Sequence, residues 1–117
     1  MKKVVYNDCF GGFAISRACA EFMAGLGNQE AMELLNIDDE ELAAYDDFEH
    51  VFYGRLSKTP RHDAILLLAI EELGSERASG DPAKLVVHEL REDRYIIKEY
   101  DGMEHVVEPH TISWVTA

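Results

Sequence analysis

The sequence predicts one α+β domain in which helices pack on one face of a largely antiparallel sheet. Three observations predict this class: a short β-prone segment near the start, apolar residues at helical spacing through the middle, and strand-like segments separated by turn residues toward the end. An order of strand, helices and then consecutive strands favours helices against an antiparallel sheet. The length of 117 residues fits a single domain over residues 1–117, with enough chain to bury one core.

The N-terminal segment predicts a strand followed by a capped helix. Residues 4–6, Val-Val-Tyr, combine β-branched and aromatic side chains, which suit a pleated, half-buried surface. Ser16 is a suitable N-cap for a helix over residues 17–26, in which apolar residues recur on one face. Gly27 fits the position just beyond that helix, where a left-handed backbone is common.

Two further helices are expected in an acidic segment. A short helix is predicted over residues 29–35, and another is predicted to begin at Asp38, because Asp38 and Glu41 match a capping box. Residues 21–49 contain many acids and neither Lys nor Arg. Acids in a first helical turn are stabilised by the helix dipole, so we interpret this segment as a solvated, helix-supporting charge run.

A buried central helix is expected after residue 59. Thr59 and Pro60 match an N-cap followed by the first helical position. Residues 64–70 are apolar almost all round, which is typical of a helix in the centre of a fold. Gly74 is expected to end this helix.

The C-terminal segment predicts a β-meander of three strands, over residues 84–90, 94–100 and 103–108. Asp101-Gly102 is a strong signal for a two-residue hairpin turn. Such a turn places three cross-strand pairs on one face of the hairpin: Tyr100 with Met103, Lys98 with His105, and Ile96 with Val107. Pro109 is expected to stop the ladder, because proline has no N–H to donate.

Charge and hydropathy narrow the possible function classes. The net charge of −12 arises from 23 acidic and 11 basic side chains, so the surface repels nucleic-acid polymers and anionic membranes. The simplest consequence of this charge is solubility. The apolar run at the N-terminus is too short for a signal peptide, and no stretch approaches the ~20 apolar residues of a membrane-spanning helix. We therefore expect a cytoplasmic protein with no membrane partner.

No metal site and no cofactor are expected. The histidines show no zinc-binding spacing, and Cys9 and Cys19 are too far apart for a paired-cysteine motif, so both are expected to be free thiols. Cys9 follows the first strand and precedes a glycine pair, which makes it a candidate nucleophile that would need His105 or His110 as its base. Burial as a small apolar side chain is the competing interpretation.

Gly11 and Gly12 mark a candidate anion-binding site. They lead toward the helix capped by Ser16, and free N–H groups at a helix start bind phosphate well. Phe10 and Phe13 flank the glycines and could stack on a nucleobase. A tight turn with no ligand is the competing interpretation of the same residues.

A basic island and a lone tryptophan complete the candidate residues. Residues 54–62 carry Arg55, Lys58 and Arg61 with no acid, and guanidinium groups match the geometry of phosphate. Trp114 is the only tryptophan and is expected either to cap the core or to stack on a ligand.

Residues 4–16, VVYNDCFGGFAIS, resemble the opening of a widespread family of small phage and prophage proteins, with a Val-x-Asn-x-Cys-Phe/Tyr-Gly-Gly-Phe motif. The chain departs from the family pattern in the acidic segment 21–49, and at Thr111, where the family tends to have Arg. The likeness otherwise continues in residues 61–63, 71–74, 78–80, 99–102, 104–105 and 108–114.

The resemblance implies a viral sponge protein, which sequesters cyclic nucleotide signals of bacterial antiphage systems such as CBASS and Thoeris without cleaving them. It implies a small-molecule nucleotide as partner, action in the cytosol of the bacterial host, and assembly as a homo-oligomer, a dimer or higher. The ligand-binding residues expected from the motif and the candidate features together are Asn7, Phe10, Gly11, Gly12, Phe13, Ser16, Arg55, Arg61, His105 and Trp114.

Two other functions remain open from the residues. A small hydrolase would use Cys9 as its nucleophile. An inhibitor of a basic protein would use the acidic surface to mimic nucleic acid.

Overall fold

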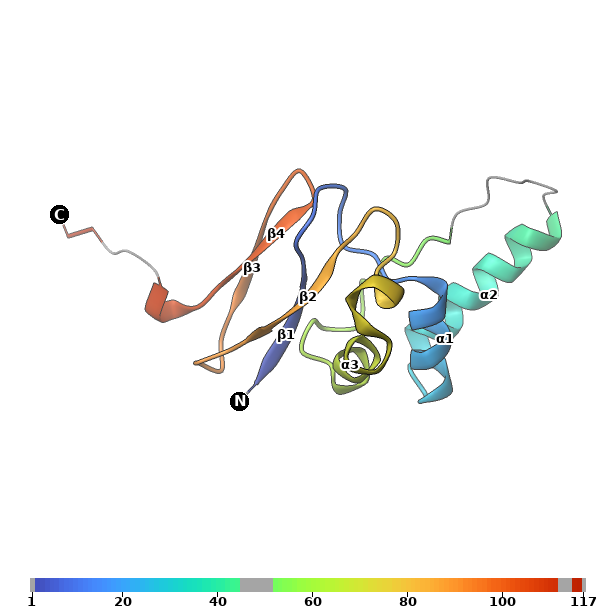
Figure 1. The fold of residues 1–117 in the computed structure, drawn as a ribbon, viewed down its shortest axis with the longest axis horizontal. Helices are drawn as coiled ribbons and strands as arrows, with labels where there is room; N and C mark the ends of the chain where they lie inside the picture. The colour runs from blue at the N-terminus through green and yellow to red at the C-terminus, as the bar shows by residue number, and fades with distance from the viewer. Residues whose placement is uncertain (1, 45–51, 112–114, 117) are drawn as a thin grey trace.

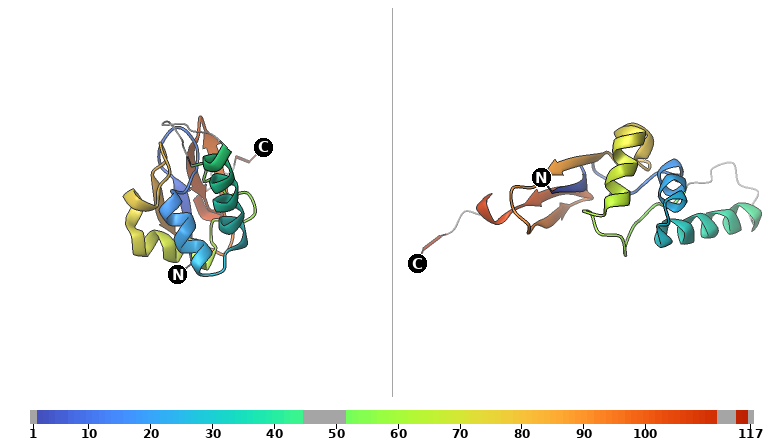
Figure 2. Two further views of the ribbon diagram at one scale, coloured as in Figure 1. Left: turned by 90° about the vertical axis from the view of Figure 1, so that its right-hand side faces the viewer. Right: turned by 90° about the horizontal axis from the view of Figure 1, so that it is seen from below.

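The computed structural model describes residues 2–44, 52–111 and 115–116, and these residues form one small α+β domain, as predicted. The strands gather at one end, helices α1 and α2 lie at the other, and α3 stands between them (Figures 1 and 2). The elements are β1 (Lys3–Asn7), α1 (Arg17–Gly25), α2 (Gln29–Ala44), α3 (Ala64–Ala78), β2 (Leu85–Glu89), β3 (Ile96–Tyr100), β4 (Met103–Val107) and the 3-10 helix η1 (Pro109–Thr111).

The strands form two antiparallel pairs. β1 pairs with β2, with Val5 opposite Val87, and β3 pairs with β4. Val4 and Val5 are both fully buried, so β1 is covered on both of its faces. β1 lies between α3 and the β3–β4 hairpin, which makes it the central strand of the fold.

The β3–β4 hairpin has the predicted turn and register. Asp101 and Gly102 both have positive φ, 49° and 87°, as a type I′ turn requires. Tyr100 lies opposite Met103, and the two other cross-strand pairs also match the expectation. The local turn residues are therefore sufficient to predict this register.

The predicted three-strand meander does not form. Its last two strands form the β3–β4 hairpin, and its first strand, β2, belongs to the other sheet. β2 pairs with β1 and does not pair with β3. The reason lies in the loop after β2, where the backbone N–H groups of Arg91 and Glu92 donate to the carboxylate of Glu108. These bonds direct the loop toward the end of β4, so the chain cannot fold straight back along β2.

Helix α1 begins and ends as predicted, whereas α2 differs. The hydroxyl of Ser16 accepts a hydrogen bond from Cys19 N, and Gly27 has a φ of +96° just beyond the helix. Helix α2 runs unbroken from Gln29 to Ala44, where two helices were predicted. Asp38 is not a cap but lies inside this helix and forms a salt bridge with Arg17. The capping-box pattern was misleading because this tertiary ion pair uses the carboxylate.

Helix α3 begins later than the Thr59-Pro60 signal predicted. Asp63 is the N-cap, and its carboxylate accepts from Ile65 N and Leu66 N. Thr59 N instead donates to Glu30 on α2, so Thr59 is held in a loop. Gly74 has the expected positive φ of 81°, but a further helical turn follows it as far as Ala78.

The hydrophobic core lies where the three helices meet the β1–β2 sheet. Its fully buried side chains include Val5, Ile15, Met23, Leu66 and Leu85. Within the described parts of the chain, none of the helices combines the length and the apolarity needed to cross a bilayer.

Candidate functional site

The loop that joins β1 to α1 packs against the β3–β4 turn, and glycine is required at three positions there. Gly11 and Gly12 have φ values of +108° and +97°, which side-chain-bearing residues rarely adopt. Gly11 N donates to Asp101 O at 3.3 Å. A β-carbon at Gly102 would collide with the backbone nitrogens of Gly11 and Gly12. The predicted glycine bend is therefore real, and it lies on the hairpin turn (Figure 1).

The side chain of Asn7 holds the glycine loop and the β3–β4 turn together. Its side chain is fully buried, and its amide nitrogen donates to Cys9 O at 2.6 Å and to Gly102 O at 2.8 Å. Its carbonyl oxygen accepts from Lys84 N at 2.8 Å. Asn7 thus joins three backbone segments and has no polar group left for a ligand.

Arg61 forms an ion pair with the buried Glu104 next to Asn7. Two guanidinium nitrogens of Arg61 lie 2.6 and 2.8 Å from the two carboxylate oxygens of Glu104, and Asn7 N donates to the same carboxylate. The guanidinium also lies over the ring of Phe13, with 3.6 Å from Cζ to the ring centroid. Phe13 is only 7% exposed and belongs to the core, and Arg61 covers the ring face that a base would need.

Arg55 is the cation that remains available. It is exposed, and its guanidinium lies beside Gly12, with one nitrogen 3.4 Å from Gly11 O. Among the described residues, no carboxylate lies within ion-pair distance of it. The backbone that carries Arg55 is held by the preceding residue, because Ile15 N donates to Gly54 O at 2.8 Å and any side chain at Gly54 would collide with Ile15 O.

These residues line two adjoining hollows, which we call the glycine–arginine cleft. One hollow of about 180 Å³ lies over Phe13 and Arg61, and another of about 230 Å³ lies over the glycine loop and the β3–β4 turn. Gly12, Arg55 and Glu99 line both. The full lining is Gly11, Gly12, Phe13, Arg55, Leu56, Arg61, Glu99, Asp101, Gly102 and Glu104.

The loop that carries Arg55 and Arg61 is anchored by Glu30, a buried residue of α2. Its carboxylate accepts from the backbone N–H groups of Ser57, Lys58 and Thr59 at 2.7 to 3.1 Å. Burial raises the pKa of Glu30, but these N–H donors outweigh burial and hold the pKa at about 2. The carboxylate is therefore charged throughout the physiological range and fixes the loop.

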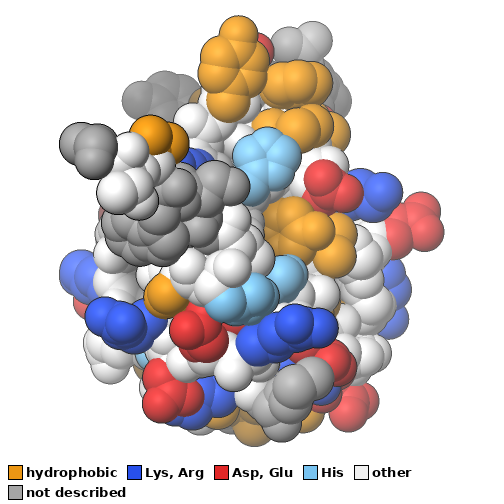
Figure 3. Space-filling model, turned by 90° about the vertical axis from the view of Figure 1, so that its left-hand side faces the viewer, with side chains coloured by type: hydrophobic (Ala, Val, Ile, Leu, Met, Phe, Trp, Pro, Cys, Tyr) orange, Lys and Arg blue, Asp and Glu red, His pale blue; other side chains and the backbone are white. Residues whose placement is uncertain are grey.

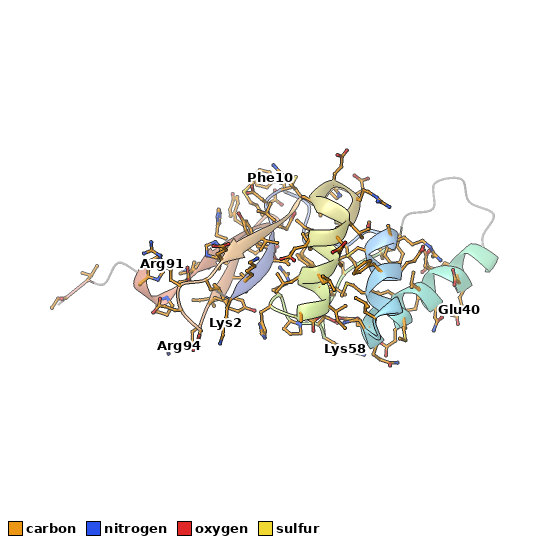
Figure 4. The ribbon with its side chains drawn as sticks, turned by 60° about the horizontal axis from the view of Figure 1, so that its bottom comes forward. Lys2, Phe10, Glu40, Lys58, Arg91 and Arg94 are labelled. Carbon is orange, nitrogen blue, oxygen red and sulfur yellow. The ribbon has the colours of Figure 1, made fainter. Side chains whose placement is uncertain are left out.

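Five of the ten expected site residues line this cleft, namely Gly11, Gly12, Phe13, Arg55 and Arg61, whereas Asn7 and Phe10 lie beside its glycine loop without lining it. Phe10 is 53% exposed on the glycine loop, at the upper edge of the molecule in Figure 4. Ser16 lies at the start of α1, where its hydroxyl donates to Arg77 O and accepts from Cys19 N, away from the cleft lining. Trp114 lies outside the described residues.

His105 points to the opposite face of the hairpin from the cleft. It is exposed and lies across from Lys98, whereas its neighbour Glu104 is buried and points inward. Ile96 and Tyr100, 54% and 76% exposed, belong to the same outer face. Figure 3 views this end of the molecule and shows hydrophobic and histidine side chains together on its surface.

Glu99 and Glu104 were missed as site residues by the sequence reasoning. The predicted hairpin register contained a usable signal, because it places both acids on the inward face with Ile97 and Val106. An acid on the buried face of a strand requires a partner. What the register does not show is that the partner of Glu104 is Arg61, a residue far away in sequence.

The cysteines differ in their surroundings. Cys19 is fully buried, and burial raises the pKa of its thiol to about 12, so it stays protonated and unreactive at neutral pH. Cys9 is half-buried on the glycine loop. Among the described residues, none of the histidines is hydrogen-bonded to its sulfur.

One group of side chains in the described residues, Glu92, Glu108 and His110, has donor atoms close enough together to hold a metal ion. Glu92 accepts from the backbone N and Nδ1 of His110, and both contacts lower the pKa of Glu92. Burial opposes ionisation of Glu108, but His88 and the N–H groups of Arg91 and Glu92 lower its pKa. These bonds give both carboxylates a role in tying the end of β4 to the loop after β2.

No protein-family model, no curated protein and no solved structure matches this chain.

Proposed function

We propose that the protein binds a cyclic nucleotide at the glycine–arginine cleft and sequesters it without cleavage, as an immune-evasion protein acting in the cytosol of a phage-infected bacterium. The single observation that carries the proposal is Arg55, whose guanidinium lies beside a glycine loop with no ion-pair partner among the described residues. Arg donates forked hydrogen bonds that match a phosphate group. Exposed Phe10 on the same loop offers a ring on which a base can stack.

The proposal divides the expected residues into those that contact the ligand and those that shape the cleft. Arg55 would hold phosphate and Phe10 would hold a base. Asn7, Phe13 and Arg61 would act by shaping the cleft, because their polar or aromatic faces are already occupied.

The size of the cleft supports assembly of two or more copies. Hollows of about 180 and 230 Å³ are smaller than the ~300–1,000 Å³ of sites that enclose a whole ligand. A second copy packed over the cleft would supply the missing wall.

Carboxylates in the cleft give the proposal a sensitive test. The charge of Glu104 is compensated by Arg61, but Glu99 also lines the cleft and repels an anion. An anionic ligand should therefore bind more weakly to Arg55→Ala and more tightly to Glu99→Gln. Lys58→Ala, an exposed cation on the same loop but outside the cleft, is the matched control.

The experiment is a thermal-shift screen of the three variants and the native chain against cyclic dinucleotides and cyclic ADP-ribose relatives. A ligand at a hundredfold excess over its Kd stabilises the fold by about 2.7 kcal/mol, which corresponds to a rise in Tm on the order of 10 °C. A ligand that stabilises Arg55→Ala as much as the native chain, or that is weakened by Glu99→Gln, would contradict the proposal.

Analysis of the released ligand separates sequestration from the two alternatives. Denaturation of the complex should release the intact nucleotide. A cleaved product that disappears in Cys9→Ser would identify a hydrolase instead. Absence of any nucleotide effect on Tm, together with salt-sensitive binding to a basic protein, would identify an acidic inhibitor.

A further inference from the structure

A separate hollow lies at the other end of β1 and shares no lining residue with the glycine–arginine cleft. Its volume is about 520 Å³, within the range of ~300–1,000 Å³ that is typical of small-molecule sites. We call it the lysine–tyrosine cavity, and it is lined by Lys2, Lys3, His62, Ala64, Leu67, Leu90, Asp93 and Tyr95. Lys2 marks its position in Figure 4, at the lower edge of the strands, whereas Phe10 lies at the upper edge.

The apolar part of the cavity wall comes from α3 and the end of β2. Ala64 and Leu67 belong to the first turn of α3, and Leu90, only 3% exposed, follows β2. Leu90 is held in place because its N–H donates to Lys2 O at 2.7 Å. This wall is part of the ordered fold, and it suits a flat apolar body.

Two aromatic side chains add a polar edge. His62 Nδ1 lies 2.7 Å from the hydroxyl of Tyr95, and the rings meet edge to face at 79°. Burial raises the pKa of Tyr95, although the charge of Arg61 opposes this, so the phenol stays protonated. The bond to Tyr95 uses Nδ1 of His62 and leaves Nε2 for another partner.

The cations of the cavity are held only by weak ion pairs. Lys2 lies 3.1 Å from Asp93, with side chains 67% and 82% exposed, and Lys3 lies 3.3 Å from Glu71, with side chains 38% and 50% exposed. Such exposed pairs contribute little, so either ammonium group can turn to a ligand at small cost. Two lysines at one cavity are notable in a chain of net charge −12.

We propose that the lysine–tyrosine cavity binds a small aromatic anion, in which a flat ring lies on Ala64, Leu67 and Leu90 and a carboxylate or phosphate group meets Lys2 and Lys3. Aromatic acids and nucleoside monophosphates share this chemistry. The site is independent of the proposed nucleotide site, because the two have no residue in common.

The experiment measures binding of four probes to the full chain by calorimetry: 4-hydroxybenzoate, AMP, phenol and inorganic phosphate. At least one of the first two should bind, whereas phenol and phosphate, each with half of the required chemistry, should bind at least about tenfold more weakly. Preference for 4-hydroxybenzoate or for AMP would identify which source of anion the cavity accepts.

Variants locate the binding site. Ala64→Trp, at an exposed position that fills the cavity mouth, should abolish binding, and Ala18→Trp on exposed α1 surface is its control. The double variant Lys2→Met, Lys3→Met should weaken binding by about tenfold or more, whereas Lys58→Met should not. Arg55→Ala should leave this binding unchanged, which separates it from the nucleotide proposal.

Three results would overturn the inference. One is the lack of measurable binding for both aromatic anions at millimolar concentration. Another is binding that survives Ala64→Trp while circular dichroism shows the variant folded. The third is inorganic phosphate binding as tightly as either aromatic probe.

Discussion

The glycine–arginine cleft and the lysine–tyrosine cavity lie at opposite ends of β1 and use charge in opposite ways. In the cleft, Arg61 and Glu104 are 20% and 6% exposed, and their pairing is shared with a backbone N–H. In the cavity, Lys2 and Asp93 are 67% and 82% exposed. Water solvates Lys2 and Asp93 whether or not they are paired. Water does not reach Glu104 well enough to replace Arg61 as its partner.

This difference separates charges that build the fold from charges that are free to bind. The Arg61–Glu104 ion pair shapes the cleft. Binding of an anion therefore falls to Arg55, which has no carboxylate partner among the described residues. The ion pairs of the cavity contribute little to the fold and can exchange for a ligand. The following predictions test this division, from the largest expected effect to the smallest.

Replacing Arg61 by Met should destabilise the protein by about 3–5 kcal/mol, because Glu104 would stay buried without its cation. Urea denaturation monitored by circular dichroism measures the change. The double variant Arg61→Met, Glu104→Met should recover much of this loss, since it leaves no buried charge unpaired. A single variant within about 1 kcal/mol of the native chain would show that the pair is solvated after all.

Replacing Glu30 by Gln should lower the free energy of unfolding by on the order of 3 kcal/mol at neutral pH, because the native pKa of about 2 lies well below the ordinary value of 4.5. The contribution is complete above the unfolded pKa of about 4.5 and is lost as pH falls toward about 2. The native chain and the variant should therefore converge in stability between about pH 4.5 and pH 2. Glu33→Gln, one turn along the same helix, should change the free energy of unfolding at neutral pH by less than about 1 kcal/mol, because its ion pair with Lys58 is exposed.

Replacing Gly12 by Ala should cost about 1–3 kcal/mol, because its φ of +97° is unfavourable for any side chain. The new β-carbon would also lie 3.2 Å from both terminal nitrogens of Arg55 and would push the guanidinium aside. Nucleotide binding at the cleft should fall, and binding at the lysine–tyrosine cavity should not. Gly25→Ala in α1, where φ is negative and nothing crowds the position, should instead stabilise the chain by about 0.5–1 kcal/mol.

Replacing Lys2 by Met should change the free energy of unfolding by less than about 1 kcal/mol, since Lys2 and Asp93 are both exposed. The same denaturation measurement as for Arg61→Met gives a direct comparison. A loss as large as that of Arg61→Met would remove the distinction between the two ends of β1.

Features that neighbouring residues determine were predicted correctly, whereas features that distant side chains determine were not. The α+β class, the Ser16 cap and the hairpin register depend on neighbouring residues, and all three are confirmed. The start of α3 and the continuity of α2 were predicted wrongly, because Glu30 and Arg17 reach across the fold to the segments concerned. A side chain that binds a distant backbone overrides a local cap signal, and no local pattern reveals it.

By itself, the sequence determined the local geometry of the glycine loop and the β3–β4 turn, since only particular residues tolerate positive φ at Gly11, Gly12 and Gly102. The tertiary structure alone decided which charges are already paired. Arg55 and Arg61 belong to the same basic island in the sequence, yet Arg61 neutralises buried Glu104 and Arg55 does not pair with any described carboxylate. Burial makes that difference, because an unpaired charge is costly away from water and inexpensive within it.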